Sequence, residues 1–415
     1  MKKTLIAVAA AAALTATSAF AEITFGAWLR SITGVASNGE DILTGTSNSW
    51  GGIRPSRVNV AGTSEDGNAG FKLDIYFNAA SWGSYVATTD EEGKKVTGKS
   101  DEFLQVGDNA YLWVKPADQI QLSIGKFDGA ETGLRGDFCY GSWNWLRPGN
   151  WIQEDEGLTF NGSHKNGLMA KITPVDGLVA VVQLPVYNPV WGGNDAAYKN
   201  GNNTIEDTFK NGMYAAAYSI EGLGTLKAGF FGDYQESGDY KKTGTVNVAF
   251  DLKAVENLYV TVGARFGIAD KEMGANNEKM KFTAGASYQV SDAMKFSVSG
   301  GYVQYQDKCT GKDRKDDSAF GIGAGVDYVI MDGLNAAADL RYKSNAGGDS
   351  DGAISFLVGV TKNVSSNGYI GVGFQGATNG NGLTGISAYK NKGTGDNTYS
   401  DNFVWAIPVS VSVWF

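Results

Sequence analysis

The clearest chemical motif in this chain spans 93–100, which reads GKKVTGKS. Two glycines followed by lysine and serine at this spacing match a phosphate-binding loop, whose backbone amides and following helix N-terminus hold phosphate. Such a loop needs a strand before it and a helix after it. The flanking stretches TTDEE and DEFLQVGD lie in a polar segment, so we interpret the match as coincidental.

Other residue patterns that could support catalysis or bind a metal are sparse. The only histidine is His164, and nothing around it specifies a nucleophilic triad or a zinc site. The carboxylates in 90–92 and 313–317 lack the spacing of a dedicated calcium loop. We therefore predict no catalytic residues, no metal site, no cofactor and no enzymatic activity. The lack of a motif alone leaves a protease or lipase as an alternative.

The densest run of charged and aromatic side chains lies between 128 and 165. Its tryptophans would expose large apolar surfaces if the segment were surrounded by water, so we expect it to pack against another part of the protein. The residues singled out there are Asp128, Glu131, Arg135, Asp137, Trp143, Trp145, Arg147, Trp151, Glu154, Asp155 and Glu156.

The elements that position these residues are predicted from a two-residue period. In 403–415, FVWAIPVSVSVWF, every odd position is a large apolar residue, so one face of the strand is oily and the other mixed. The same alternation predicts strands at 71–77, 246–253, 258–268, 280–290, 320–330, 334–342 and 354–360.

The connectors between these strands are of two kinds. Short ones join an acidic residue, a turn-tolerant residue and an apolar residue, and they occur at 118–120, 176–178, 221–223, 256–258, 292–294 and 332–334, with looser relatives at 65–68 and 365–368. Long polar ones occupy 37–52, 81–102, 128–165, 188–210, 233–243, 307–318 and 377–402.

This alternation of short and long connectors is typical of an all-β, transmembrane antiparallel β-barrel, with short periplasmic turns and long extracellular loops. Eight short turns, an opening strand and a closing strand predict about 18 strands. Sixteen is the alternative if the turn near Ser365 or the stretch 157–167 is misread. A soluble β-propeller or a pair of β-sandwiches has the same periodicity but does not need the paired connectors.

Residues 1–21 are predicted to be a cleaved signal peptide, because two lysines precede a short apolar run and a small-residue cleavage site. Its removal leaves 394 residues (415 − 21) at 22–415 as a single transmembrane barrel. Because both lysines are lost, the formal net charge changes from −9 to −11. No later stretch of 18 apolar residues predicts a helical span.

Charge and cysteine content narrow the possible partners. The acidic excess is not the electrostatic pattern of a protein that binds nucleic acid, so no nucleic-acid partner is expected. Cys139 and Cys309 are the only cysteines, too few for a disulfide framework, and the sequence leaves their pairing open.

The strand period also predicts which charged residues face the interior. With the oilier face outward, the inner face carries nine basic residues, Arg30, Arg57, Lys72, Lys227, Lys253, Arg265, Lys281, Lys295 and Arg341, and four acidic residues, Asp74, Asp251, Asp327 and Asp339. We select Arg30, Arg57, Lys72, Arg265 and Arg341, together with Trp414, as lumen-wall candidates.

In its signal, strand repeat, connector asymmetry and terminal Phe415, the chain resembles the bacterial outer-membrane porin superfamily of 16- to 18-stranded barrels. The resemblance implies a water-filled channel for passive diffusion of small hydrophilic solutes and ions. It also implies that the third extracellular loop, 128–165, folds into the lumen as a constriction loop opposite the basic wall, although a loop capping the mouth is the alternative. A homotrimer, contact with outer-membrane lipid, and Phe415 as a signal to the barrel-assembly machinery are implied as well.

Two other functions fit parts of the sequence. Trp28 and Trp414 face inward by parity, and together with the loop tryptophans they are similar to the aromatic track of saccharide-specific porins. The tripeptide 135–137 reads Arg-Gly-Asp, which some cell-surface receptors bind, so a surface adhesin or structural barrel is the third hypothesis.

Overall fold

The computed structural model describes residues 22–37, 42–47, 56–77, 86–89, 95–98, 104–135, 166–186, 204–237, 240–270, 278–305, 308–309, 312–313, 318–344, 352–378 and 403–415. Almost all of these residues are in β-strands. The strands that form the wall are β1 (Glu22–Ser37), β2 (Ile42–Ser47), β3 (Arg57–Thr63), β4 (Ala69–Phe77), β7 (Leu104–Ala117), β8 (Ile120–Lys126), β9 (Gly167–Ile172), β10 (Leu178–Pro185), β11 (Met213–Ile220), β12 (Gly224–Ser237), β13 (Tyr240–Leu252), β14 (Leu258–Asp270), β15 (Glu278–Ser291), β16 (Met294–Tyr305), β19 (Ser318–Met331), β20 (Leu334–Lys343), β21 (Ala353–Ser365), β22 (Gly368–Ala377) and β23 (Val404–Trp414).

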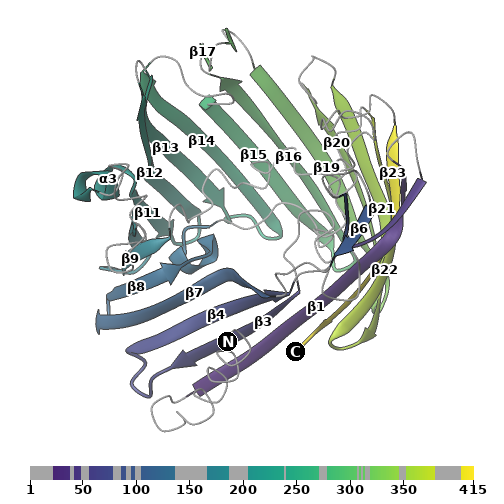
Figure 1. Ribbon diagram of the computed structural model, residues 1–415, viewed down its shortest axis with the longest axis horizontal. Coiled ribbons are helices and arrows are strands. Elements are labelled where there is room, and N and C mark those ends of the chain that lie inside the picture. Colours follow the sequence, from purple (N-terminus) through teal and green to yellow (C-terminus); the bar gives the residue numbers. More distant parts are fainter. Residues whose placement is uncertain are drawn as a thin grey trace.

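The wall strands form one closed antiparallel sheet (Figure 1). From β3 onward each wall strand pairs with the next, and β23 returns to β1 in a register that runs from Trp28↔Trp414 to Ser37↔Trp405. The sheet contains 19 strands, but β2 and β3 pair with different parts of β1 and share one place in the wall, which leaves 18 positions (19 − 1). The predicted barrel of 18 strands is confirmed, and the alternative of 16 is wrong.

The two faces of the wall have opposite chemistry. On β12, Leu226 faces outward and is 50% exposed, whereas its neighbour Lys227 faces inward and is only 3% exposed. On β23, Val411 is exposed and Ser412 is buried. A soluble protein buries its apolar residues, so an apolar outer surface around polar inner positions is the arrangement of a barrel that lies in lipid.

Eight short turns join neighbouring strands at one end of the barrel, which we call the turn end. They occupy 64–68, 118–119, 173–177, 221–223, 253–257, 292–293, 332–333 and 366–367, as the short-connector pattern predicts. Asn257 has a φ of 63°, a left-handed conformation that asparagine tolerates better than most side chains. The opposite end, which carries the longer connections, is the loop end.

Two predicted long connectors contribute residues to strands of the wall. The segment 233–243 is mostly taken up by β12 and β13, which leave only 238–239 between them. Strand pairing continues there through polar residues, with Glu236 opposite Lys241 in the register, so polar composition alone does not end a strand. Similarly, 42–47 within the predicted connector 37–52 forms β2 and pairs with β1.

The loop end carries small additional elements. β5 (Val86–Thr89) pairs with β6 (Lys95–Gly98), and β17 (Lys308–Cys309) pairs with β18 (Lys312–Asp313). Helix α3 (Ile205–Lys210) begins with a capping box between Thr204 and Asp207. Among the described helices, none is both long and apolar enough to cross a membrane.

Candidate channel lining

The third long connection lies between the end of β8 at Lys126 and the start of β9 at Gly167. Its described portion, 127–135, contains the short 3-10 helix η2 (Gly129–Thr132) and three predicted site residues, Asp128, Glu131 and Arg135. The other predicted residues of the loop lie outside the described residues: Asp137, Trp143, Trp145, Arg147, Trp151, Glu154, Asp155 and Glu156.

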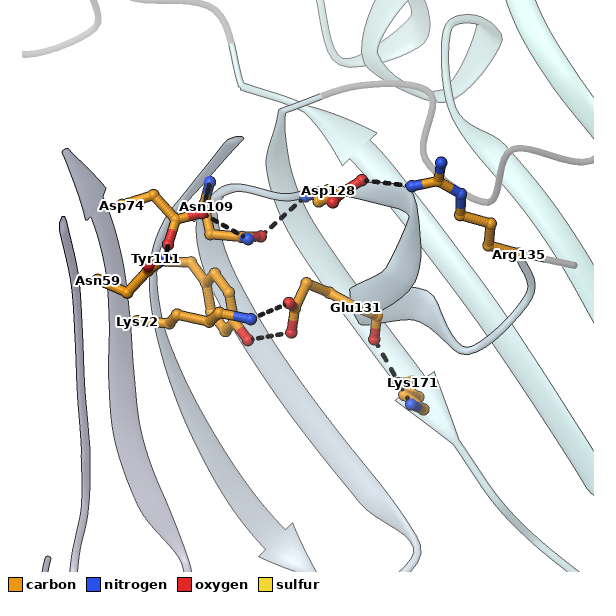
Figure 2. Close-up of polar contacts among 9 residues, drawn as sticks. All are labelled: Asn59, Lys72, Asp74, Asn109, Tyr111, Asp128, Glu131, Arg135 and Lys171. Atoms are coloured by element: carbon orange, nitrogen blue, oxygen red, sulfur yellow. Dashed lines mark hydrogen bonds and ion pairs between the residues drawn. The ribbon is translucent and has the colours of Figure 1, made fainter. Parts of the chain in front are cut away.

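Glu131 lies against inward-facing side chains from two strands (Figure 2). Its carboxylate forms an ion pair with Lys72 on β4 and accepts a 2.6 Å hydrogen bond from the Tyr111 hydroxyl on β7. Lys171 on β9 donates to the backbone carbonyl of Glu131 at 3.5 Å. Thus a single acidic residue of the connection contacts three separate strands of the wall.

A second group of polar contacts is centred on the buried carboxylate of Asp74. Asn59 donates to one oxygen, while the backbone and side-chain amides of Asn109 donate to the other at 3.1 and 2.9 Å. The Asn109 side-chain oxygen then accepts from the backbone N–H of Asp128 at 2.9 Å (Figure 2). Neutral donors therefore satisfy this buried charge, and Asn109 connects it to the start of the third connection.

An apolar patch on the inner wall holds the same segment. Phe127 and Leu134 are buried, Leu134 completely, and the Phe127 ring lies 5.1 Å from that of Tyr111. They belong to one hydrophobic cluster with side chains from β9 to β12, among them Met169, Val181, Met213 and Phe231. We call these six residues, Phe127, Leu134, Met169, Val181, Met213 and Phe231, the loop seat.

The loop seat was not predicted, because strand parity alone suggested a polar inner face throughout. A signal was present in β10, where Leu178–Val182 reads LVAVV and loses the alternation that the other strands keep. A strand with apolar residues on both faces needs a partner on each side. Here the outer face is apolar, and the inner face contributes to the loop seat.

Arg30, Arg57, Lys72, Arg265 and Arg341 lie on wall strands, as does Trp414. The predicted inward position of Lys253 is wrong, because β13 ends at Leu252 and Lys253 lies in the turn 253–257. Several of the wall cations are neutralised nearby. Arg341 makes a bidentate contact with Asp339, at 2.8 and 3.2 Å. Arg265 lies 3.2 Å from Glu278. Lys227 forms a 2.5 Å ion pair with Asp251. A count of nine basic residues against four acidic ones therefore overstates the positive field of the wall.

The seam between the last and first strands contains a different arrangement. The Arg30 guanidinium lies 3.9 Å from the centre of the Trp28 ring, and the Arg57 guanidinium lies 5.6 Å from it. Trp28 donates a 2.6 Å hydrogen bond to the Ser412 hydroxyl. Trp414, which pairs with Trp28 in the register, packs with Tyr369 at a ring separation of 6.0 Å.

Phe415, the predicted assembly signal, lies at the end of this seam. Its backbone N–H and carbonyl form hydrogen bonds with Ala27 at 2.9 and 3.1 Å. The residue is 76% exposed, and strand parity places its side chain on the same outer face as Val411. The backbone thus extends the last strand while the side chain remains at the outer surface.

The motifs that suggested other chemistry do not assemble a site within the described ranges. Lys95–Gly98, the centre of the GKKVTGKS stretch, is a β-strand paired with β5 and not a phosphate-binding loop. Among the described residues, no three histidine, cysteine or acidic side chains are grouped as a metal site. His164, Cys139, and Gly136 and Asp137 of the Arg-Gly-Asp tripeptide lie outside these ranges.

A closed barrel of 18 antiparallel strand positions, apolar outside and polar within, defines the class of large transmembrane β-barrels of outer membranes. The family model described as "Gram-negative porin" matches residues 7–348. The chain therefore belongs to the Gram-negative porin family, and it is an outer-membrane porin channel and not an enzyme.

Solved structures of similar proteins include OmpT of Vibrio cholerae in a trimer form, with 14% identity, a TM-score of 0.48, and coverage of 95% of this chain and 99% of that chain. The anion-selective porin from Comamonas acidovorans has 13% identity, the same TM-score of 0.48, and coverage of 95% and 99%. The channel DcaP of Acinetobacter baumannii has 11% identity, a TM-score of 0.47, and coverage of 95% and 97%. No curated protein sequence matches the chain significantly.

Proposed function

We propose that this porin is a passive diffusion channel for small hydrophilic solutes and ions, and that its third connection, 128–165, folds into the lumen and narrows it. The observation that carries the proposal is the contact of Glu131 with inward-facing Lys72 and Tyr111. A segment bound in this way starts its path on the inner side of the wall.

The energetics of the described segment support this path. The loop seat gives the connection an apolar anchor, and burial of a leucine or phenylalanine side chain stabilises by about 1.5–3 kcal/mol. Polar contacts hold the same segment to β4 and β7: Glu131 binds Lys72 and Tyr111, and the backbone N–H of Asp128 binds Asn109. A constriction must hold its shape while solutes pass, and several anchors at its start serve that need.

The charges around the lumen then act on passing ions. Acidic residues of the connection stand opposite a wall with basic residues, and rings or walls of opposite charge govern selectivity in narrow pores. Because Arg341, Arg265 and Lys227 are each paired with a carboxylate, we assign the strongest unbalanced field to other wall cations.

The remaining features of the proposal concern export and assembly. Residues 1–21 act as a signal peptide that is cleaved, and the turn end faces the periplasm. The apolar outer face contacts outer-membrane lipid, and Phe415 serves the barrel-assembly machinery. The functional unit is a homotrimer, a state that one similar structure, OmpT of Vibrio cholerae, is described as having.

A saccharide-specific channel and an adhesin are the competing functions. The inward aromatics Trp28 and Trp414 favour the first, but the Trp28 ring is partly covered by Arg30. An adhesin would need the third connection at the outer surface, whereas its described start contacts the inner wall. We therefore retain general diffusion as the proposed function.

The test is a planar-bilayer recording with the purified, folded protein in KCl. Diffusion through an open lumen predicts stepwise increases in current as single barrels or trimers insert. Added maltooligosaccharides should not block that current, because no sugar site is proposed. Folded protein that inserts and gives no steps would contradict the channel, and a saturable block by sugar would favour the saccharide-specific alternative.

A further inference from the structure

The seam where β23 meets β1 contains two arginines that differ from the other wall cations. Arg30 lies on β1 and Arg57 on β3, both facing inward and both near the same Trp28 ring. The Arg30 side chain also interacts electrostatically with Arg57 and with Tyr369 on β22. Two positive groups therefore share one aromatic surface.

Neither arginine has a carboxylate partner among the described residues. Arg30 is only 3% exposed, yet its Nε and Nη1 atoms have no hydrogen-bond partner there, and the Arg57 Nε atom has none either. By contrast, Arg341, which is equally buried, has both Nε and Nη2 bound to Asp339. The Arg265 Nε atom is also without a hydrogen-bond partner there, but the Arg265 guanidinium still has Glu278 as a carboxylate partner, which Arg30 and Arg57 lack among the described residues.

The surrounding polar groups do not supply the missing acceptor. The Ser56 hydroxyl accepts a 2.8 Å hydrogen bond from the backbone N–H of Arg30 and donates a 2.9 Å hydrogen bond to the Arg30 carbonyl. It therefore binds the backbone of Arg30 and not the guanidinium. The carboxylate of Asp74 on the neighbouring β4 is already bound by Asn59 and Asn109. Stacking on the Trp28 ring offsets part of the free-energy cost of desolvating a guanidinium. The indole offers no lone pair that could accept a hydrogen bond from the guanidinium N–H groups.

A buried cation with open donors is costly until an anion or another acceptor occupies them. Guanidinium groups match carboxylate and phosphate oxygens in geometry and charge. Arg57 is only half-buried, so an anion in the lumen reaches the pair from its side. Two arginines with the same orientation toward the interior would attract one anionic group better than either alone.

We propose that Arg30 and Arg57, backed by Trp28, form a discrete binding site for a small oxyanion, either a carboxylate or a phosphate group, in the wall of the lumen. The site rests on the proposed channel function, because solutes reach it through the lumen. It adds saturable recognition of one chemical group to passive diffusion.

The experiment compares single-channel conductance in KCl, potassium acetate and potassium phosphate over a range of concentrations. Conductance in KCl should rise in proportion to concentration, whereas acetate, phosphate or both should reach a plateau as the site fills. Saturation by acetate alone identifies a carboxylate ligand, and saturation by phosphate alone identifies a phosphate ligand. Proportional conductance in both salts would overturn the proposal.

Substitutions locate the site. Arg30→Met and Arg57→Met keep the apolar stem and remove charge and donors, so each should raise the half-saturating concentration about tenfold or more. The double variant Arg341→Met with Asp339→Asn also removes one wall arginine, together with the charge of its carboxylate partner, and should keep the wild-type half-saturation. Equal effects of all three variants would show a general field and overturn a discrete site.

Calorimetric titration of the folded protein in detergent with acetate and phosphate separates this proposal from the channel function. Heat of binding that is lost in Arg57→Met supports the site even when no conductance is seen. If current steps appear in KCl but neither conductance saturation nor calorimetry detects binding of acetate or phosphate, the channel function stands and the proposed oxyanion site is refuted.

Discussion

The Tyr111 hydroxyl donates a 2.6 Å hydrogen bond to the carboxylate of Glu131, and this contact joins the third connection to the inner wall (Figure 2). Lys72 binds the other carboxylate oxygen, so both oxygens are used. The described start of the connection is thus held in a fixed position against the inner wall.

Glu131→Gln should weaken the anchorage without changing side-chain size. The ion pair with Lys72 is lost, and because Lys72 is about one-third exposed we expect a cost of only about 1 kcal/mol. The temperature at which the folded barrel loses its compact gel mobility should fall. Glu206→Gln, which breaks an exposed pair with Lys210 on α3, is the matched control and should leave that temperature unchanged.

Leu134→Ala should have a larger effect, because Leu134 is fully buried in the loop seat. Removal of a buried leucine side chain costs about 2–5 kcal/mol through lost burial and the cavity left behind. We expect noisier single-channel currents as the connection loosens. Leu226→Ala on the outward face is the control, and identical current noise in both variants would contradict the loop seat.

Asp251→Asn tests the buried pair with Lys227. Loss of one partner leaves an uncompensated charge in the wall, at a cost of about 3–5 kcal/mol, so the yield of folded barrel should drop sharply. The double variant Lys227→Met with Asp251→Leu removes both charges and should recover most of that yield. If the double variant folds no better than the single one, the penalty does not come from the unpaired lysine.

The turn at 64–68 should make the folded barrel sensitive to acid. The Ser64 hydroxyl, and then the backbone and side-chain amides of Asn68, hold the pKa of Asp66 below its usual value. A carboxyl whose pKa is lowered on folding stabilises above its unfolded pKa, and that contribution is lost as pH falls through the folded pKa. Asp66→Asn should remove this part of the pH dependence between neutral and acidic pH. If the unfolding rates of the wild-type protein and of Asp66→Asn have the same pH profile, Asp66 does not contribute to the acid sensitivity.

Deletion of Phe415 should reduce the amount of barrel in the outer membrane and leave the conductance of each channel unchanged. The ring is exposed on the outer surface, whereas the backbone bonds to Ala27 close the seam. Phe415→Ala keeps these backbone bonds and therefore separates loss of the ring from loss of the residue. Normal membrane levels of both variants would argue against an assembly signal.

Alternating polarity was enough to predict the barrel, and the eight short turns together with an opening and a closing strand predicted its strand number. The same two-residue period predicts an inward face for Arg30, Arg57 and Arg341. A two-residue period fixes the face of a side chain, but it does not identify the residue beside it on the next strand. The pairing of Arg341 with Asp339 could have been suspected, because both lie inward on one strand. The contact of Arg30 with Trp28 could also have been suspected. That no carboxylate of the described residues pairs with Arg30 depends on the register of the seam.

The loop seat was beyond the reach of periodicity for a related reason. Met169, Val181, Met213 and Phe231 lie on the four consecutive strands β9 to β12, and the register of their pairing brings them together against Leu134. A local pattern such as LVAVV shows that a strand has two apolar faces, but it does not show which segment covers the inner one.

The most direct test of a third connection inside the lumen is chemical modification during a bilayer recording. Glu131→Cys, made in a Cys139→Ser, Cys309→Ser background, is treated with a charged thiol reagent while single channels are open. We predict a discrete change in conductance on modification, and none in the background protein without the new cysteine. A cysteine that reacts fully while the current stays constant would contradict the account.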